Sequence, residues 1–384
     1  MSVLIVSNGH GEDAVGALLA QTVRRGGGDV VAYPLVGDGA AYHGVPLLGP
    51  RRALPSGGFA LRAGWAGWRQ LWPDLRAGGF RLWFHQRRTL RQQARQHKLV
   101  VAVGDVYCLW MASRARVPVI FVATAKSEYN ERHSAFEHSL MRRHASIVFT
   151  RDDATAEALA KRGVRARYEG NPLMDAIPQD GRRLSVPTGT PVIALLPGSR
   201  ADALRNVVEL LKICRRVSAS EAGMFVCAMP YNLRMGEVAS RAERAGWEVD
   251  GESLVSGDAR VVMTREFGGA LRAATVAVGL AGTANEQAAG LGMPVVTFPV
   301  KGAVQVTPRF LQLQKRLLGD ALVPAPNWED AAEEVVQLLR NPDERARRAK
   351  VGRQRMGHTG AVESVVREIL SSTGKGLSKT SPRA

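Results

Sequence analysis

Short apolar runs alternate with helical segments along most of this chain, and that alternation restricts the folds open to it. Residues 3–6 and 99–103 are apolar runs of strand length, and residues 192–196 begin a second series of them. Strands of parallel sheets are buried on both faces, so they read as continuous apolar runs with helices between them. The sequence therefore predicts an α/β protein with two doubly wound, Rossmann-like domains.

The boundary between the two domains is predicted from composition. Proline and glycine cluster between residues 171 and 190, where they interrupt regular secondary structure. We expect an N-terminal domain over residues 1–175 and a C-terminal domain over residues 176–349, with the carboxyl ends of both sets of strands around one central cleft. The Lys/Ser/Pro-rich tail at 371–384 is expected to be disordered.

The most specific local pattern lies near residue 280. An apolar run ends in a turn of small residues, an Ala-rich helical segment follows, and Gly-Met-Pro leads into another apolar run. Such a unit places Gly282 and Thr283 at a helix N-terminus, where free N–H groups and the helix dipole favour an anion. Glu286 lies one turn into the helix and could accept hydrogen bonds from sugar or ribose hydroxyls. The pattern predicts a seat for a nucleotide-sugar diphosphate.

A second candidate phosphate loop follows the apolar run at 192–196. Gly198, Ser199 and Arg200 come directly after it and open a helix. Ser199 could cap that helix, and the guanidinium of Arg200 could hold a phosphate through two N–H bonds. The loop lacks the spacing and the lysine of a Walker loop, and a structural turn with a solvated arginine is the alternative.

Titratable groups follow two strands of the first domain. His10, Glu12 and Asp13 come soon after the first apolar run, and a later run is followed by Asp105. A carboxylate at the carboxyl end of a buried strand is placed to take a proton from a substrate hydroxyl. We predict that Asp105, or else His10 or Glu12, is the catalytic base. The alternative makes Asp13 and Asp105 helix N-caps.

Two polar residues flank Pro172 at the predicted domain boundary. Asn171 and Asp175 are expected to hold the hinge or to line the cleft. A purely structural linker is the alternative.

Four of the seven tryptophans lie within residues 65–83, and arginines are interleaved with them. Aromatic rings prefer the headgroup level of a bilayer and arginines bind anionic lipid, so this stretch is typical of a segment that lies on a membrane surface. The net charge of +17 agrees with an anionic partner. Base stacking on nucleic acid, or an aromatic subcore beneath a loop, would use the same residue types. The tryptophans are Trp65, Trp68, Trp72 and Trp83.

The sequence lacks the patterns of common metal sites. It has no Asp-x-Asp triplet, the usual metal–diphosphate device of nucleotide-sugar enzymes, and no His/Cys cluster with zinc spacing. We therefore expect neither a metal nor a cofactor. No apolar run approaches the ~20 residues of a membrane span, and no signal peptide precedes the first strand, so a cytoplasmic protein is expected.

Three motifs carry a family resemblance: Gly-Asn-Pro-Leu-Met-Asp-Ala-Ile-Pro at 170–178, Leu-Leu-Pro-Gly-Ser-Arg at 195–200, and Gly-Thr-Ala-Asn-Glu-Gln-Ala-Ala-Gly-Leu-Gly-Met-Pro at 282–294. Together they resemble the lipid-A-disaccharide synthase family and its related proteins, over the chain to about residue 370. The resemblance implies a GT-B fold in which a C-terminal helix, here at about 350–370, packs back on the N-terminal domain. It further implies that the first domain binds the acceptor and the second the nucleotide sugar.

The activity that this resemblance implies is an inverting, metal-independent transfer. An acylated glucosamine would move from a UDP-sugar to an acylated glucosamine phosphate at the inner membrane face. Asp105 matches the family's proposed base. The implied partners are a nucleotide-sugar donor, a lipid or glycolipid acceptor and an anionic membrane surface, with no nucleic acid. The positions that match the family's UDP site are Gly198, Ser199, Arg200, Thr283 and Glu286.

The first domain departs from the family's motifs. The family usually has Gly-Glu-x-Ser-Gly-Asp after the first strand, where this chain has Gly-His-Gly-Glu-Asp at 9–13. Around the base it has Asp-x-Pro-Asp-Phe-Asn, where this chain has Gly-Asp-Val-Tyr-Cys at 104–108. The resemblance therefore supports the assignment of the donor more firmly than that of the acceptor. A UDP-sugar 2-epimerase, which shares the fold and donor site, and a basic nucleic-acid-binding protein are the alternative functions.

Overall fold

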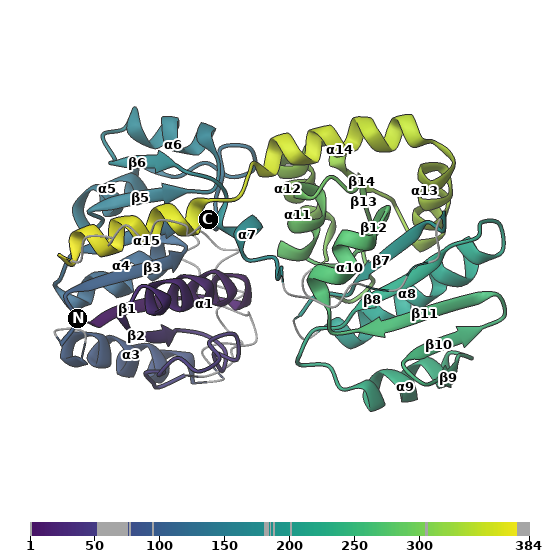
Figure 1. Cartoon of the computed structure of the whole chain (residues 1–384), viewed down its shortest axis with the longest axis horizontal. Coiled ribbons are helices and arrows are strands. Elements are labelled where there is room, and N and C mark those ends of the chain that lie inside the picture. Colours follow the sequence, from purple (N-terminus) through teal and green to yellow (C-terminus); the bar gives the residue numbers. More distant parts are fainter. Residues whose placement is uncertain are drawn as a thin grey trace, which may run out of the picture. The chain divides into compact units, whose positions relative to one another are not determined.

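The chain forms two compact units, each built on its own sheet (Figure 1). The first comprises residues 1–176 together with 359–384, and the second comprises residues 177–358. A computed structural model describes residues 2–51, 76, 78–93, 96–179, 184, 186, 189–199, 202–303 and 306–374.

The first unit is centred on a six-stranded parallel sheet with strand order β2-β1-β3-β4-β5-β6. Alternate side chains of β1 enter different apolar clusters: Leu4 and Val6 face one side of the sheet, and Val3 and Ile5 face the other. Burial on both faces explains the continuous apolar runs. The strands are β1 Ser2–Ser7, β2 Asp29–Pro34, β3 Leu99–Gly104, β4 Val119–Ala123, β5 Ile147–Thr150 and β6 Ala166–Tyr168.

Helices cover both faces of this sheet. One cluster is contributed by α1 and α15, and the other by α3, α4 and α5. The predicted Rossmann-like architecture is therefore confirmed for this unit. The helices are α1 His10–Arg25, α3 Gly79–Gln93, α4 Val106–Ala112, α5 Ala135–His144, α6 Asp153–Ala160, α7 Pro172–Asp175 and α15 Ala361–Ser372.

The chain returns to the first unit through α15, which packs against α1 (Figure 1). Val362, Val365 and Ile369 lie on one face of α15 and are buried among the side chains of α1. The helix predicted at 350–370 is wrong in one respect, because two helices occupy that region. Residues 350–356 belong to α14 of the second unit, Pro342–Met356, and the break falls at Gly357 and Gly360, whose φ angles of 71° and 112° interrupt the helix.

The predicted start of a disordered tail at residue 371 is also wrong. Ser371 and Ser372 close α15, and Thr373 is only 6% exposed. The hydroxyl of Thr373 donates to the carbonyl of Ile369 at 2.9 Å, which ties this end to the helix. Residues 375–384 lie outside the described part of the chain.

The second unit contains an eight-stranded sheet with strand order β14-β13-β12-β7-β8-β11-β10-β9. Its first six strands in this order are parallel, and β10 and β9 add an antiparallel edge. That edge was not predicted, because all three residues of β9 are exposed and carry no apolar pattern. The strands are β7 Val192–Leu196, β8 Met224–Ala228, β9 Glu248–Asp250, β10 Ser253–Ser256, β11 Ala259–Thr264, β12 Val276–Gly279, β13 Val295–Thr297 and β14 Leu322–Pro324.

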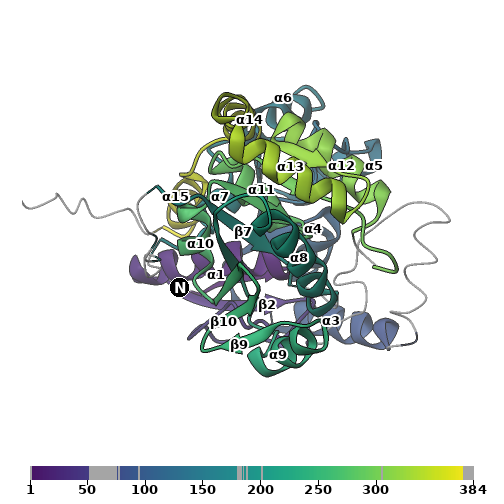
Figure 2. The same ribbon diagram turned by 90° about the vertical axis from the view of Figure 1, so that its right-hand side faces the viewer.

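Helices α8 and α13 lie side by side on this sheet (Figure 2). Ile193 and Leu195 of β7 share an apolar cluster with Leu211 of α8 and Val335 of α13. No helix among the described residues combines the length and the apolar character that crossing a bilayer requires. The helices are α8 Ala203–Ser218, α9 Met235–Arg244, α10 Phe267–Ala273, α11 Thr283–Gly290, α12 Pro308–Leu318, α13 Trp328–Arg340 and α14.

Candidate functional site

Each sheet has one point at which the order of its strands reverses. In the first unit β1 has β2 on one side and β3 on the other, and in the second unit β7 lies between β8 and β12. Ligands of open α/β sheets bind in the crevice beyond the carboxyl ends of the strands at this switch point. The residues that follow β1 and β3, and those that follow β7 and β12, are therefore the two candidate sites.

Asp105 lies at the switch point of the first unit, directly after β3. Its Oδ1 accepts hydrogen bonds from the backbone N–H of Cys108 at 2.9 Å and from Nδ2 of Asn8 at 3.2 Å. Asp105 is thus the N-cap of α4 and a neighbour of the β1 loop at once. Burial, together with the charge of Glu12, raises the pKa of Asp105 from 3.8 to about 7. The N-cap and the titratable carboxyl are compatible roles for this residue.

Asp13 belongs to the same site. It is 2% exposed, and its Oδ1 accepts a 2.6 Å hydrogen bond from the hydroxyl of Ser7, which itself accepts one from Tyr42 at 2.8 Å. Burial raises the pKa of Asp13 to about 7. The alternative that Asp13 caps a helix is wrong, because α1 begins at His10 with Gly9 as its N-cap and Asp13 lies inside the helix.

Glu12 completes a group of three carboxyls. A Cβ added to Gly9 would lie 2.6 Å from Oε2 of Glu12, and one added to Gly104 would lie 3.3 Å from its Cγ. The side chain therefore passes close to the loops after β1 and β3, which require glycine at φ values of 139° and 137°. His10 begins α1, and its side chain lies outside the described residues.

The same sheet edge carries polar residues that the sequence did not indicate. Thr124 directly follows β4, whose last residue Ala123 pairs with Gly104, and its backbone N–H donates to the carbonyl of Gly104 at 3.1 Å. Arg151 follows β5, is 3% exposed and donates from Nη1 to the carbonyl of Thr124 at 3.0 Å. Both residues directly follow an apolar strand, as Asp105 does, but only the observed strand order shows that they lie at the same sheet edge.

In the second unit the loops after β7 and β12 approach each other closely. Gly198 has φ 80°, and a Cβ there would lie 3.1 Å from the carbonyl oxygen of Leu280. The buried side chain of Asn206 joins the loops, because its Nδ2 donates to the carbonyls of Pro197 at 2.8 Å and Leu280 at 3.3 Å. Asn206 was missed because it lies on α8, away from both motifs in the sequence.

The capping role predicted for Ser199 is wrong. Ser199 does not cap a helix, since α8 begins at Ala203 with Asp202 as its N-cap residue. Ser199 is exposed, and its carbonyl accepts a hydrogen bond from Nδ2 of Asn232 at 3.1 Å. Arg200 lies outside the described residues.

The loop after β12 leads into the N-terminus of α11, as predicted. Gly282 is the N-cap residue, Thr283 is the first helical residue, and Glu286 lies half-buried in the first turn. Gln314 of α12 fixes the loop by donating from Nε2 to the carbonyls of Ala281 and Gly282, each at 3.1 Å. The loop carbonyls are thereby bound within the protein, and the helix N-terminus carries the positive end of the dipole.

Asn171 and Asp175 lie at the two ends of the short helix α7 in the first unit. Oδ1 of Asn171 accepts from the backbone N–H of Leu173 at 3.0 Å and caps α7. Asp175 accepts from the backbone N–H groups of Gly360 at 2.7 Å and Val362 at 2.8 Å, at the start of α15. Burial raises the pKa of Asp175. Both side chains connect helix ends within this unit.

The predicted membrane-surface tryptophans are described only in part. Trp65, Trp68 and Trp72 lie outside the described residues. Trp83 of α3 is half-buried, with Phe80 and Trp110 stacked at ring distances of 5.7 Å and 6.3 Å.

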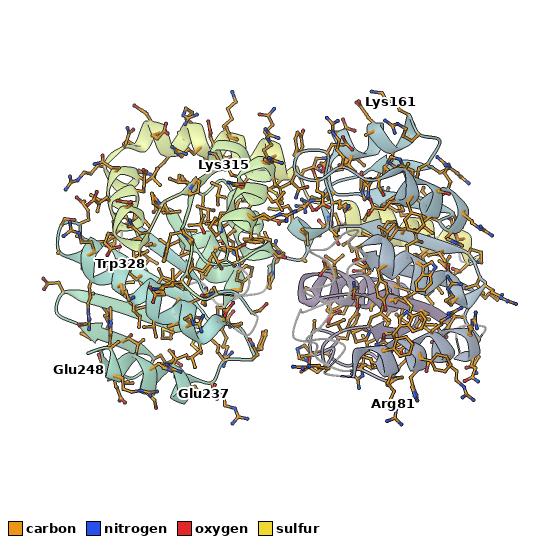
Figure 3. All side chains as sticks on the ribbon, turned by 180° about the vertical axis from the view of Figure 1, so that it is seen from behind. Arg81, Lys161, Glu237, Glu248, Lys315 and Trp328 are labelled. Carbon is orange, nitrogen blue, oxygen red and sulfur yellow. The ribbon has the colours of Figure 1, made fainter. Side chains whose placement is uncertain are left out.

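The exposed aromatic rings of α3 are phenylalanines. Phe80 is 65% exposed and Phe84 is 58% exposed, four residues apart on one face of the helix. Arg81 of the same helix extends outward from the unit (Figure 3). An apolar and basic surface is therefore present at α3, and among its described residues Phe80 and Phe84 are the exposed rings.

Comparison with known proteins finds relatives in one group. Over 231 residues the chain is 30% identical to a lipid-A-disaccharide synthase of Myxococcus xanthus, covering 54% of this chain and 57% of that one. The chain thus matches little more than half of that relative's length. A lipid-A-disaccharide synthase of Solibacter usitatus is 26% identical over 283 residues, with 67% and 70% covered. No protein-family model matches. The predicted resemblance is confirmed by these relatives.

Solved structures share the fold over nearly the whole chain. The calicheamicin glycosyltransferase CalG4 has a TM-score of 0.61 at 14% identity, with 99% of each chain covered. A UDP-N-acetylglucosamine 2-epimerase of Neisseria meningitidis bound to UDP-N-acetylglucosamine has a TM-score of 0.54 at 14% identity, with 97% of this chain and 100% of that one covered. MurG of Acinetobacter baumannii has a TM-score of 0.55 at 12% identity, with 96% and 99% covered. The fold is GT-B, as predicted.

Proposed function

We propose that the chain is a glycosyltransferase that moves a glucosamine from a UDP-sugar to a lipid-linked sugar. The glucosamine is expected to be acylated. The transfer is expected to invert the anomeric carbon and to need no metal ion. The observation that carries the proposal is the chemistry of the two switch points. One holds a carboxyl whose pKa lies near 7, and the other joins two glycine loops and a helix N-terminus. The names of the relatives support this reaction class.

The donor diphosphate is proposed to bind in the second unit. Gly198 and Gly282 let the backbone approach the phosphates, and the N-terminus of α11 favours their charge. Glu286 lies in the first turn of α11 and is proposed to accept hydrogen bonds from ribose hydroxyls. As UDP leaves, the negative charge that grows on it is stabilised by these fixed dipoles and by Arg200. The solved neighbour with bound UDP-N-acetylglucosamine supports a nucleotide-sugar donor.

The acceptor hydroxyl is proposed to lose its proton to Asp105. A base with a pKa near the working pH is both deprotonated in part and strong enough to take the proton as the hydroxyl attacks. Attack from the face opposite the leaving UDP inverts the anomeric carbon. Asn8 and the N–H of Cys108 hold the carboxylate in a fixed orientation through its Oδ1.

The acceptor is proposed to be presented at the cytoplasmic face of an anionic membrane. Phe80 and Phe84 offer apolar surface on α3, and arginines on the same helix would meet lipid phosphates. Association of this kind needs no spanning segment. Nucleic acid is not an expected partner.

The direct test is a transfer assay with purified protein. UDP-2,3-diacylglucosamine and 2,3-diacylglucosamine 1-phosphate are incubated with it in detergent micelles, with and without EDTA, and UDP release and glycolipid mass are followed. A disaccharide product that forms equally in both conditions is expected. Formation only without EDTA would contradict metal independence, and its absence with every lipid acceptor tried would contradict the transfer itself.

A second candidate function, UDP-sugar 2-epimerase, is favoured by the fold shared with the Neisseria meningitidis enzyme. It needs no acceptor, so UDP-N-acetylglucosamine alone separates the two. Nuclear magnetic resonance of the incubated nucleotide sugar would show a manno-configured product if the chain were an epimerase. The proposed transferase leaves the sugar configuration at C2 unchanged.

A further inference from the structure

Tyr231 is the most exposed large apolar side chain in the described part of the chain, with 80% of its surface accessible. It lies in the turn that follows the carboxyl end of β8. Met229 and Leu233, 7% and 6% exposed, belong to the core cluster and fix both ends of this turn. The N–H of Leu233 donates to the carbonyl of Pro230 at 3.1 Å and closes it. The ring is therefore held out at the sheet edge by a turn that is anchored on both sides.

Arg265 fixes this turn from the neighbouring strand. It follows β11, and its guanidinium donates to the carbonyls of Pro230 and Leu233. The same guanidinium lies 5.8 Å from the centre of the Tyr231 ring. A ring whose supporting turn is held at two carbonyls loses little conformational freedom when a ligand packs on it.

The turn also adjoins the candidate phosphate loop. Nδ2 of Asn232 donates to the carbonyl of Ser199 at 3.1 Å, and β8 is the strand next to β7 in the sheet. Neighbouring strands are about 4.8 Å apart. Tyr231 thus lies beside the β7–β12 switch point, on the β8 side of it.

We propose that Tyr231 is the stacking platform for the base of the nucleoside diphosphate whose phosphates occupy this switch point, an inference that rests on the proposed function. A nucleoside attached to that diphosphate extends toward β8 or toward β13. On the β13 side Phe298 is 1% exposed and packs in the core. On the β8 side Tyr231 presents an accessible ring. Stacking tolerates any base, so Tyr231 secures the nucleoside without selecting uracil.

Among the described residues, a ring on α12 competes for this role. Phe310 of α12 would lie 3.7 Å from a Cβ at Gly282 and is half-buried against the core cluster. Because it lies next to the other loop of the switch point, it is the comparison that the experiment requires.

The test measures binding of UDP and of inorganic pyrophosphate by isothermal titration calorimetry. Tyr231→Ala is expected to weaken UDP binding about tenfold, equal to about 1.4 kcal/mol, and to leave pyrophosphate binding unchanged. Tyr231→Phe keeps the ring and is expected to stay within about twofold of the native protein for both ligands. Phe136→Ala removes another exposed ring, 62% accessible on α5, and is the matched control with native affinities.

The outcomes separate the two proposals. Native UDP affinity in Tyr231→Ala would overturn the inference and leave the proposed function intact. So would an equal loss of UDP and pyrophosphate, which would mean that the turn acts only through the phosphate loop. A loss in Phe310→Leu but not in Tyr231→Ala would place the base toward β13 and also overturn it. If the native protein bound neither UDP nor pyrophosphate, the proposed function would fail and the inference with it.

Discussion

Asp105 caps helix α4 and also carries a titratable carboxyl. Its ability to act as a base depends on whether that carboxyl is ionised. Its pKa of about 7 means that it is mostly protonated at pH 6 and mostly ionised at pH 8. Turnover by a base in this state rises with pH through about 7 and then levels off. Asp105→Asn keeps the size and the cap acceptor but cannot take a proton. We expect kcat to fall by about 10²- to 10⁴-fold, with the Kd for UDP unchanged.

The pH profile of Glu12→Gln distinguishes the two carboxyls. Glu12 raises the pKa of Asp105 by charge repulsion, so its replacement should move the midpoint of the kcat profile to lower pH while turnover persists. Steady-state kinetics between pH 5.5 and 8.5 give both numbers. A collapse of turnover in Glu12→Gln, with Asp105→Asn still active, would assign the base to Glu12 instead.

Asp13 gives a prediction about stability. Its pKa is about 7 in the folded protein and near 3.8 when unfolded, so the folded state binds more protons between these values. The free energy of unfolding therefore falls as pH rises through that window, by an amount on the order of 4 kcal/mol for this one buried group. Asp13→Asn removes the dependence. Thermal unfolding at pH 5 and pH 8 should show that Asp13→Asn is more stable, relative to the native protein, at the higher pH. A stability difference between the two proteins that is the same at both pH values would contradict the burial argument.

The site residues that the sequence could predict are those next to a strand end. Asp105, Glu12 and the glycines of both loops follow such strand ends, and the turns at Asp105 and at Gly282 form as expected, whereas the helix after Gly198 begins later than expected. Tyr42 and Asn206 reach the sites from other segments of the chain, so no spacing in the sequence connects them. Long-range partners of this kind appear only once the sheets are assembled.

Among the elements, those with a buried apolar face were predictable and those without one were not. Helix α8 shows this best, because buried Val207 and Leu211 recur at helical spacing. The hairpin of β9 and β10 was missed because its outer strand, β9, is three exposed residues long and has no apolar pattern. The break between α14 and α15 was missed because apolar positions continue on both sides of it.

Helix α15 depends on a cap supplied from another element. Asp175 of α7 accepts from the first N–H groups of α15, which would otherwise lack helical partners. Asp175→Ala should cost about 1–2 kcal/mol of unfolding free energy, seen as a lower Tm by circular dichroism. Glu363→Ala, an exposed acid in the same first turn, is the matched control and should change stability by less than about 0.5 kcal/mol. Equal Tm values for the two variants would show that the cap contributes nothing.

At the scale of the whole molecule, a net charge of +17 favours any anionic surface, so charge alone cannot identify the partner. Phe80 and Phe84 allow lipid to be distinguished from other anionic partners, because an exposed apolar pair is stabilised by insertion into lipid and not by contact with phosphates. The protein should sediment with vesicles containing phosphatidylglycerol but not with pure phosphatidylcholine, and less so as salt rises.

The double substitution Phe80→Ser with Phe84→Ser should weaken vesicle binding about tenfold at fixed salt while the net charge stays the same. Phe136→Ser on α5 removes an equally exposed ring from another helix and should bind as the native protein does. If both variants sediment like the native protein, only charge drives association. If an oligonucleotide then competes fully with vesicles at matched salt, the basic surface binds nucleic acid. The reason is that only lipid binding depends on the insertion of apolar rings.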